Sequence, residues 1–218
     1  MTDTPDSGPY RQLTTLRAAA VAGIVFAVLF ATSLVLMRLT LPSDPFTPWA
    51  TRNDARITIA VLMMPFAGIA FLWFLGVVRD RLGHLEDRFF STVVLGSGVL
   101  FLAMVFVATA TAGATLALSR HSHSPHDEVI SFGREFMLHI SNVYGVRMAA
   151  VFMISLATIW FRTALVPRLL VLVTYLLALV LLIVVSHSLW VTLVFPSWVL
   201  VISVYLLATG RRESSHSP

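Results

Sequence analysis

The chain has 218 residues, of which 57% are hydrophobic and only 12% are charged, and its formal net charge at pH 7 is +4. An ordinary soluble domain of this size needs far more polar side chains on its exterior, so the composition predicts a membrane protein. All 15 basic residues are arginines scattered singly between apolar runs, which argues against nucleic-acid binding, and the lack of cysteine excludes disulfides and thiolate chemistry.

Residues 1–17 are polar and contain two aspartates, whereas a secretory signal peptide begins with a basic region. We therefore expect a polar tail followed by a retained membrane helix. The first apolar run, residues 18–37, has the about 20 residues that a helix needs to cross the hydrocarbon core. The next predicted spans are residues 57–78 and 89–118, and the second of these, at about 45 Å, must tilt or project from the bilayer.

The fourth predicted span, residues 136–161, contains Arg147. A helix that begins at Phe136 places Arg147 about 16 Å in, near the bilayer midplane. A second interpretation begins the helix at Val143, so that Arg147 snorkels to the outer interface and residues 132–142 lie along the membrane surface. We favour the second of these interpretations.

Residues 169–209 contain no charged side chain, and as one helix they would measure about 60 Å. We therefore expect two spans, residues 169–186 and 189–209, joined by a tight turn at residues 186–188, with a polar tail at residues 210–218. The predicted fold class is all-α: a polytopic transmembrane helical bundle of about six helices.

Arginine placement predicts the orientation, because loops on the cytoplasmic side carry an excess of basic residues. With the N-terminus inside, nine arginines lie on the cytoplasmic side and five on the outer side, so both termini are expected in the cytoplasm and the protein in the cell membrane. The nine are Arg11, Arg17, Arg79, Arg81, Arg88, Arg162, Arg168, Arg211 and Arg212; the five are Arg38, Arg52, Arg56, Arg120 and Arg134. The aromatic residues expected near the inner interface are Trp73, Phe74, Trp160 and Phe161.

Two features predict how the helices bend and pack. Pro65 and Pro196 lie inside expected spans, and each removes a backbone hydrogen bond and should kink its helix. Residues 108–115, Ala-Thr-Ala-Thr-Ala-Gly-Ala-Thr, place small side chains four apart, which lets helix backbones approach closely. We interpret this segment as a packing seam at the centre of the bundle, with a dimer interface as the alternative.

Residues 71–110, FLWFLGVVRDRLGHLEDRFF followed by STVVLGSGVLFLAMVFVATA, resemble bacterial multi-pass integral membrane proteins that carry no assigned activity. The resemblance is one of general style over the second and third spans and rests on no diagnostic motif. It therefore implies no substrate and no catalytic residue.

Arg147 is the sharpest polar feature within the expected spans, since none of them contains an Asp or Glu. A buried guanidinium must face water, an anionic ligand or a dense set of oxygen acceptors. If Arg147 is buried, we expect a substrate site for an anion or a lipid headgroup, with Asn142 and His139 beside it.

Histidines predict a second candidate site, on the outer side. His121, His123 and His126 precede two carboxylates, Asp127 and Glu128, and imidazoles with carboxylates can bind zinc or copper. The same segment also has the composition of an ordinary polar loop, which is the interpretation we favour, so no cofactor is predicted and zinc or copper is the alternative.

Two further kinds of site are disfavoured. His139 and His187 lie at similar depth and could hold a haem, but bundles of that kind usually carry more than one histidine pair. Residues 96–98, Gly-Ser-Gly, lack the full spacing of a serine nucleophile motif, and Ser97 lies far in depth from either histidine.

These observations favour a non-enzymatic integral membrane or accessory protein. A small permease or channel with a polar site around Arg147 is the first alternative, and a metal binder on the extracytoplasmic face is the second. The expected partners are membrane lipids, together with a second copy of the chain or another membrane protein, and no nucleic acid.

Overall fold

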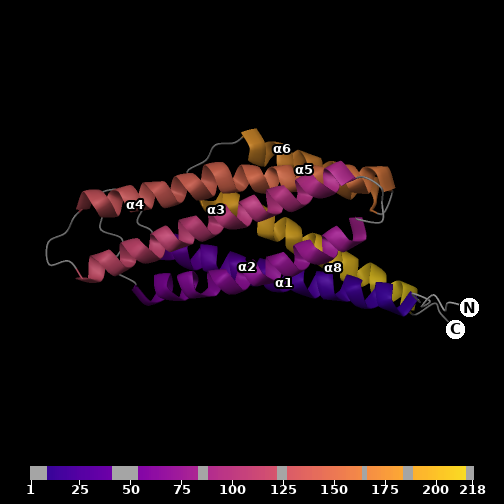
Figure 1. Ribbon diagram of the computed structural model, residues 1–218, viewed down its shortest axis with the longest axis horizontal. Helices are drawn as coiled ribbons and strands as arrows, with labels where there is room; N and C mark the ends of the chain where they lie inside the picture. The colour runs from indigo at the N-terminus through magenta and orange to yellow at the C-terminus, as the bar shows by residue number, and fades with distance from the viewer. Residues whose placement is uncertain are drawn as a thin grey trace, which may run out of the picture.

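The computed structural model describes residues 9–40, 54–82, 88–121, 127–163, 166–183 and 189–214. Every regular element in these ranges is a helix, and the helices lie side by side in one elongated bundle (Figure 1). The all-α class and the helical-bundle architecture predicted from the sequence are confirmed.

The first three helices match the first three predicted spans and extend beyond them at both ends. They are α1 (Pro9–Thr40), α2 (Asp54–Leu82) and α3 (Arg88–His121). Each contains a long apolar stretch, residues 18–40, 55–79 and 89–119, that is sufficient in length and composition to cross a membrane. The polar residues that flank these stretches extend the helices into the headgroup regions or beyond.

The fourth helical segment is continuous from Asp127 to Thr163 and has three parts. They are α4 (Asp127–His139), the π-helical turn η1 (Ile140–Gly145) and α5 (Val146–Thr163). Both sequence-based interpretations began this helix later, at Phe136 or at Val143, because residues 127–135 carry four charged side chains. The structure instead continues the helix through them, and residues 128–163 form a single candidate span.

The helix α4 packs as part of the bundle because one of its two faces is apolar and contacts the other helices. Its apolar inner face buries Met137 and Leu138, and Gly133 lies so close to the Thr115 hydroxyl of α3 that a Cβ there would collide with it. On the opposite face Phe132 and Phe136 are exposed, with ring centroids 5.8 Å apart. A segment lying on the membrane surface would leave the inner face without this helix partner.

The remaining helices are shorter. They are α6 (Arg168–Ile183), α7 (Leu189–Thr192) and α8 (Val194–Ser214). At 16 residues, α6 measures about 24 Å, shorter than a hydrocarbon core of about 30 Å. The expected turn at residues 186–188 lies outside the described residues.

The helices follow one another around the bundle in the order α6, α5, α3, α2, α1, α8. Figure 1 shows that the beginning of α1 and the end of α8 lie at the same end. We call this half of the bundle (residues 9–30, 65–82, 88–104, 146–163, 166–183 and 189–214) the terminal half. The opposite half (residues 31–40, 54–64, 105–121 and 127–145) is the distal half, and it contains no part of α6, α7 or α8.

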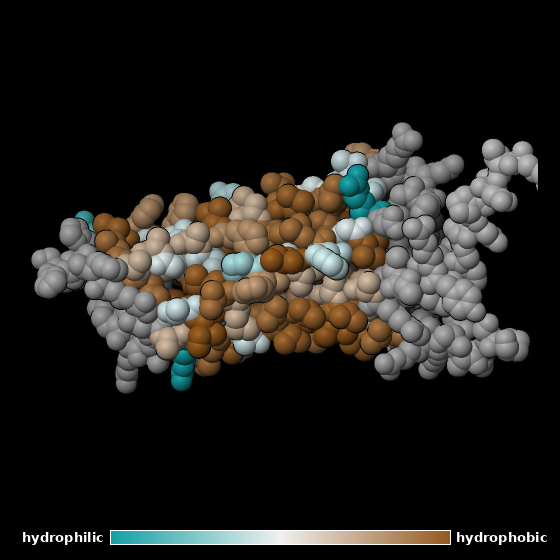
Figure 2. All heavy atoms as spheres, turned by 60° about the horizontal axis from the view of Figure 1, so that its bottom comes forward, coloured by the Kyte–Doolittle hydropathy of each residue, from teal (hydrophilic) through white to brown (hydrophobic). Residues whose placement is uncertain are grey.

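The outside of the bundle is apolar over most of its length. Figure 2 shows a largely hydrophobic surface, with the most strongly hydrophilic side chains in view near the two ends of the described part. Large apolar side chains such as Leu62, Phe66 and Leu169 are more than half exposed. A surface of this kind is stable where hydrocarbon replaces water around the protein. The chain is therefore a transmembrane helical bundle.

Aromatic rings fill the centre of the terminal half. Phe195, at the start of α8, is 2% exposed, and its ring centroid lies 4.6 Å from that of Phe101 on α3. Four further rings surround it, with centroids 5.9 to 6.1 Å away: Phe26 of α1, Phe71 of α2, Phe152 of α5 and Trp198 of α8. One side chain thus joins five helices.

The contact between α1 and α8 depends on a glycine. A Cβ on Gly23 would collide with the hydroxyl of Ser203, which is itself fully buried. Small residues let two membrane helices approach closely in this way. Trp198 then ties α8 to α6, because its indole N–H donates to the Thr174 hydroxyl at 2.9 Å.

The core of the distal half is smaller and contains no aromatic ring. Its buried residues are Met37, Ile57, Ala60, Ala108, Ala112, Leu116, Met137 and Leu138. Residues 108–115 contribute the seam expected from the sequence, with Ala108, Thr109, Ala112 and Thr115 all buried. The Ser33 hydroxyl donates to the Ala60 carbonyl at 2.8 Å and links α1 to α2 at the border of this half.

Candidate functional site: a π-helical turn and an apolar crevice

The π-helical turn η1 interrupts the longest described helical segment and lies beside α7. A π-helical turn is rare, and such turns frequently occur at functional sites. Asn142 in this turn is 6% exposed, and neither its amide nitrogen nor its amide oxygen has a hydrogen-bond partner among the described residues. An unpartnered buried amide costs about 1–3 kcal/mol, so Asn142 is a buried polar group that a ligand or a water would stabilise.

Arg147 lies two residues beyond η1, in the first turn of α5, and its side chain is partly buried. Its guanidinium Nη1 donates to the Val143 carbonyl at 3.3 Å, a long distance for a hydrogen bond from a charged donor. The sequence supplies no acidic partner nearby, since residues 136–212 contain no Asp or Glu. Arg147 is thus held weakly, by its own helix.

The structure does not gather the three predicted substrate residues into one pocket. His139 is exposed, and its ring lies 6.2 Å from that of Tyr144, which is also exposed. Asn142, in contrast, is buried within the bundle. Arg147 does not line either of the two crevices described next.

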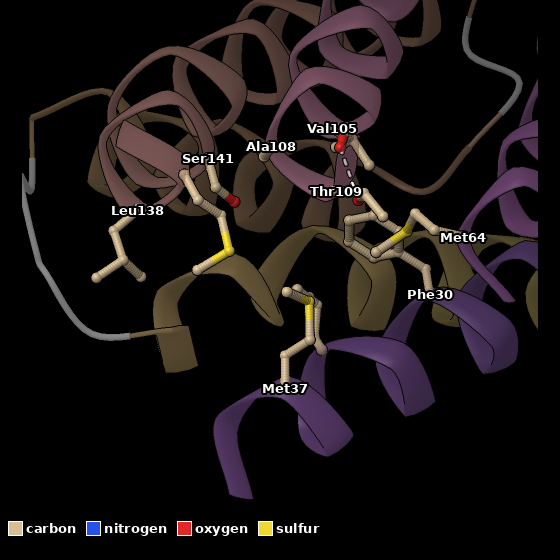
Figure 3. A pocket seen from close by; sticks show the side chains of 10 residues that line it. Phe30, Met37, Met64, Val105, Ala108, Thr109, Leu138 and Ser141 are labelled. Carbon is tan, nitrogen blue, oxygen red and sulfur yellow. Dashed lines mark hydrogen bonds between the residues drawn. The ribbon is translucent and has the colours of Figure 1, made fainter. Parts of the chain in front are cut away.

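An apolar crevice opens in the distal half between α1, α2, α3 and α4. Its interior has a volume of about 20 Å³, little more than one water molecule needs, and it is partly open to the surroundings. Figure 3 shows Met37 and Met64 reaching into it from α1 and α2, and Leu138 and Ser141 approaching from α4 and η1. The Thr109 hydroxyl on its wall already donates to the Val105 carbonyl at 2.8 Å, so the lining offers few polar groups.

A second crevice, of about 10 Å³, adjoins the first. The two share Phe30, Val105 and Ser141. Leu181 of α6 and Thr192 of α7 also line the second crevice, so these two helices border it.

The predicted metal site falls largely outside the described residues. His123 and His126 are not among them, and of His121 only the backbone, at the end of α3, is described. Within the part of the chain that the structure describes, no three histidine or acidic side chains are grouped so that they could hold a metal ion. The zinc or copper site at His121, His123 and His126 stays a prediction.

The other disfavoured sites are placed only in part. The Ser97 hydroxyl is buried and donates to the Val93 carbonyl of its own helix at 2.6 Å, as expected of a serine inside a membrane helix. His187, the second histidine of the haem alternative, lies outside the described residues.

The aromatic residues expected at the inner interface divide into two kinds. Trp73 and Phe161 are 70% and 64% exposed and can reach the headgroup region, whereas Phe74 and Trp160 are buried in the core. Nearby, the Arg162 guanidinium lies 4.9 Å from the centre of the Phe90 ring, which joins α5 to α3 at this end.

Sequence reasoning did not find the crevice, because its walls come from helices far apart in the chain. One signal for it was present on α1, where Phe30, Leu34 and Met37 recur at helical spacing and Arg38 follows on the same face. Comparison with protein-family models, with curated proteins and with solved structures finds no match to this chain.

Proposed function

We propose that this chain is a non-enzymatic, multi-pass accessory protein of the cell membrane, with both termini in the cytoplasm. The observation that supports it most directly is the aromatic centre of the terminal half, where Phe195 packs against rings from α1, α2, α3 and α5. A permeation pathway along the bundle axis would have to cross these rings. The bundle is therefore suited to bind other molecules at its sides.

The arginines support the orientation. Helix ends that carry nine arginines gather at the terminal end, and those that carry Arg38, Arg56, Arg120 and Arg134 gather at the other. Between Arg17 and Arg38 lie about 32 Å of α1, close to the thickness of a hydrocarbon core. The positive-inside rule then assigns the terminal end to the cytoplasm.

This placement also fits a snorkelling role for Arg147. One membrane interface is placed at the level of Arg162. Arg147 then lies about 22 Å from this interface along α5, in the last third of the hydrocarbon core before the opposite interface. A long arginine side chain can extend from there to the headgroups.

Fusions of alkaline phosphatase and of a fluorescent protein test the topology. Fluorescence is expected for fusions at residue 218 and within residues 83–87, and phosphatase activity within residues 41–53 and 122–126. Phosphatase activity at residue 218 would contradict the proposed orientation.

A small permease is the second candidate, and the buried amide of Asn142 is the observation that favours it. In proteoliposomes we expect no substrate-dependent flux from the wild type above empty liposomes. Flux that is abolished by Arg147→Ala or Asn142→Leu, and retained in the exposed control Arg56→Ala, would replace the accessory role with transport.

Asn142→Leu has a further readout, the free energy of unfolding. Because both amide atoms lack partners, an apolar side chain of similar size should leave stability unchanged or raise it by about 1–3 kcal/mol. A loss of more than about 1 kcal/mol would show that a bound water or ligand satisfies the amide.

A further inference from the structure

We propose that the bilayer-facing side of η1 and α5 binds the phosphate of a membrane phospholipid, held by the guanidinium of Arg147 and the hydroxyl of Tyr144. This inference rests on the membrane insertion proposed above and deepens it by naming a ligand and a site. Such a site requires a guanidinium with unused donors, a second donor on the same face, and a depth in the membrane that phosphates can reach.

The Arg147 guanidinium has unused donors. Among the described residues its one hydrogen bond runs from Nη1 to the Val143 carbonyl at 3.3 Å, and a guanidinium has five N–H donors. No carboxylate competes for them on the helices packed around α5, because α3, α5 and α6 contain no Asp or Glu. A phosphate supplies the charged acceptors that the protein itself lacks here.

The π-helical turn brings Tyr144 to the same side as His139. Within η1 a hydrogen bond joins residues five apart, from the Val146 N–H to the Ser141 carbonyl. In an uninterrupted α-helix, side chains five apart point in directions that differ by about 140°. Here the rings of His139 and Tyr144 are 6.2 Å apart at their centroids, and both side chains are exposed. The turn thus presents Tyr144 outward, with the His139 ring beside it.

Arg147 lies on the same outward stripe as Tyr144. Exposed and partly exposed side chains recur at helical spacing along this stripe: Tyr144, Arg147, Val151, Ile154, Thr158 and Phe161. Side chains three apart are neighbours on a helix surface. Helical side chains also lean toward the N-terminus of their helix, and the bond to the Val143 carbonyl shows that Arg147 does so. Its guanidinium therefore extends toward the level of Tyr144.

The depth of the two residues suits a phosphate. Arg147 lies about 22 Å from the interface at Arg162, so its Cα is about 8 Å short of the opposite edge of a 30 Å hydrocarbon core. Tyr144 lies about 4–5 Å closer to that edge. Tyrosine is enriched at this boundary, and a long arginine side chain extends to it. Both donors then meet the layer of lipid phosphates.

The surroundings of the site favour a lipid over a dissolved anion. Residues 128–163 form one candidate membrane span, so this stripe faces hydrocarbon below the level of the two donors. Val151 and Ile154 are partly exposed there, and Phe161 is exposed near the other end. A phospholipid places its chains along these side chains and its phosphate at the donors, whereas a free phosphate would have to leave water.

Native mass spectrometry of the detergent-purified protein tests the proposal. The probes are phosphatidylglycerol and a diacylglycerol of the same chain lengths, which lacks the phosphate. We expect phosphatidylglycerol to bind at least about tenfold more tightly, since hydrogen bonds to charged groups contribute that much to affinity. Arg147→Gln should abolish this preference, and Arg147→Lys, which keeps the charge, should retain part of it. The control Arg56→Gln removes an exposed charge of α2 and should retain all of it.

Tyr144→Phe tests the second donor, because it removes only the hydroxyl. It should weaken phosphatidylglycerol binding about threefold and leave diacylglycerol binding unchanged. Tyr175→Phe is the matched control, since the Tyr175 hydroxyl is paired with that of Thr158 at 2.8 Å, and it should change neither. Elution as a single species on size exclusion qualifies each variant, and Tyr144→Phe decides alone if Arg147→Gln does not fold.

Equal binding of the two lipids to the wild type would overturn the proposal, as would an equal loss of preference in Arg56→Gln. Displacement of phosphatidylglycerol by an equal concentration of inorganic phosphate would show an anion site open to water, and would also overturn it. The topology fusions do not depend on these results, so failure of the lipid site and failure of the proposed membrane role are distinguishable.

Discussion

The terminal and distal halves of the bundle are packed by different kinds of side chain. In the terminal half, α8 places Phe195 among the rings of four other helices, and Trp198 extends the cluster to Trp160 at 6.0 Å. In the described distal half the buried apolar side chains are methionine, alanine, leucine, isoleucine and one valine, Val105. Aromatic rings fix their neighbours through size and geometry, whereas methionine tolerates changes around it.

This difference follows from where α6, α7 and α8 lie. The terminal half has α6 and α8 to complete its core. The distal half contains neither helix, and a small crevice lies there between α1, α2, α3 and α4. We therefore expect mutations of core residues to cost more stability in the terminal half than in the distal half.

Phe195→Ala should have the largest effect on stability. Removal of a buried phenylalanine costs about 3–5 kcal/mol, and here it leaves a cavity that borders five helices. The free energy of unfolding in mixed detergent micelles measures the loss. Phe66→Ala, at a side chain that is 60% exposed, is the control and should change stability little. Equal losses in the two variants would remove the distinction between a packed centre and a lipid-facing surface.

Gly23→Ala should have the next largest effect, because the new Cβ collides with the Ser203 hydroxyl. Overpacking of this kind costs about 1–3 kcal/mol. Gly76→Ala is the matched control, since nothing lies within 4 Å of a Cβ at that position. In the same unfolding assay, Ser203→Ala should recover part of the loss when combined with Gly23→Ala. A double variant as unstable as the single one would contradict the contact.

Met137→Leu should cost less than about 1.5 kcal/mol, because it conserves volume in an adaptable site. The unfolding free energy, measured in the same assay as for Phe195→Ala, should therefore fall only slightly. A loss as large as that of Phe195→Ala would show that the distal half is packed as rigidly as the terminal half.

Single interhelical hydrogen bonds should have the smallest effects, and they compare the two halves directly. Ser33→Ala removes the bond to the Ala60 carbonyl, and Trp198→Phe removes the bond to the Thr174 hydroxyl. Bonds of this type in membrane proteins contribute about 0.6 kcal/mol on average. The unfolding free energy should fall by a similar amount in both variants, and a much larger loss in Trp198→Phe would indicate that its indole ring also supports packing.

Much of the fold could be predicted from the sequence, because a long run without charge has few alternatives to a membrane helix. The beginning of the fourth segment could not, since residues 127–135 carry charges on one side and pack on α3 with the other. A hydropathy profile records the charges of this segment but does not show that they lie on one face of a helix. The amino-acid composition does not predict the π-helical turn.

The candidate site was predictable only in its polar part. Asn142 and Arg147 were recognisable in the sequence as polar groups inside an apolar span. Which of the two side chains faces the core depends on how far the helix rotates about its axis through η1. The position and the lining of the crevice depend on which helices are neighbours and on where α6 ends and α7 begins. Met37, Met64 and Met137 come together only once the bundle is assembled.

The π-helical turn η1 has a consequence for how the two halves are joined. An α-helix turns by about 100° per residue, so a wide turn changes the direction in which all preceding side chains point relative to all following ones. Shortening η1 by one residue would restore α-helical geometry and rotate α4 about its axis while α5 kept its place. Gly133 would then turn away from Thr115, so one residue of chain length sets which face α4 presents to α3.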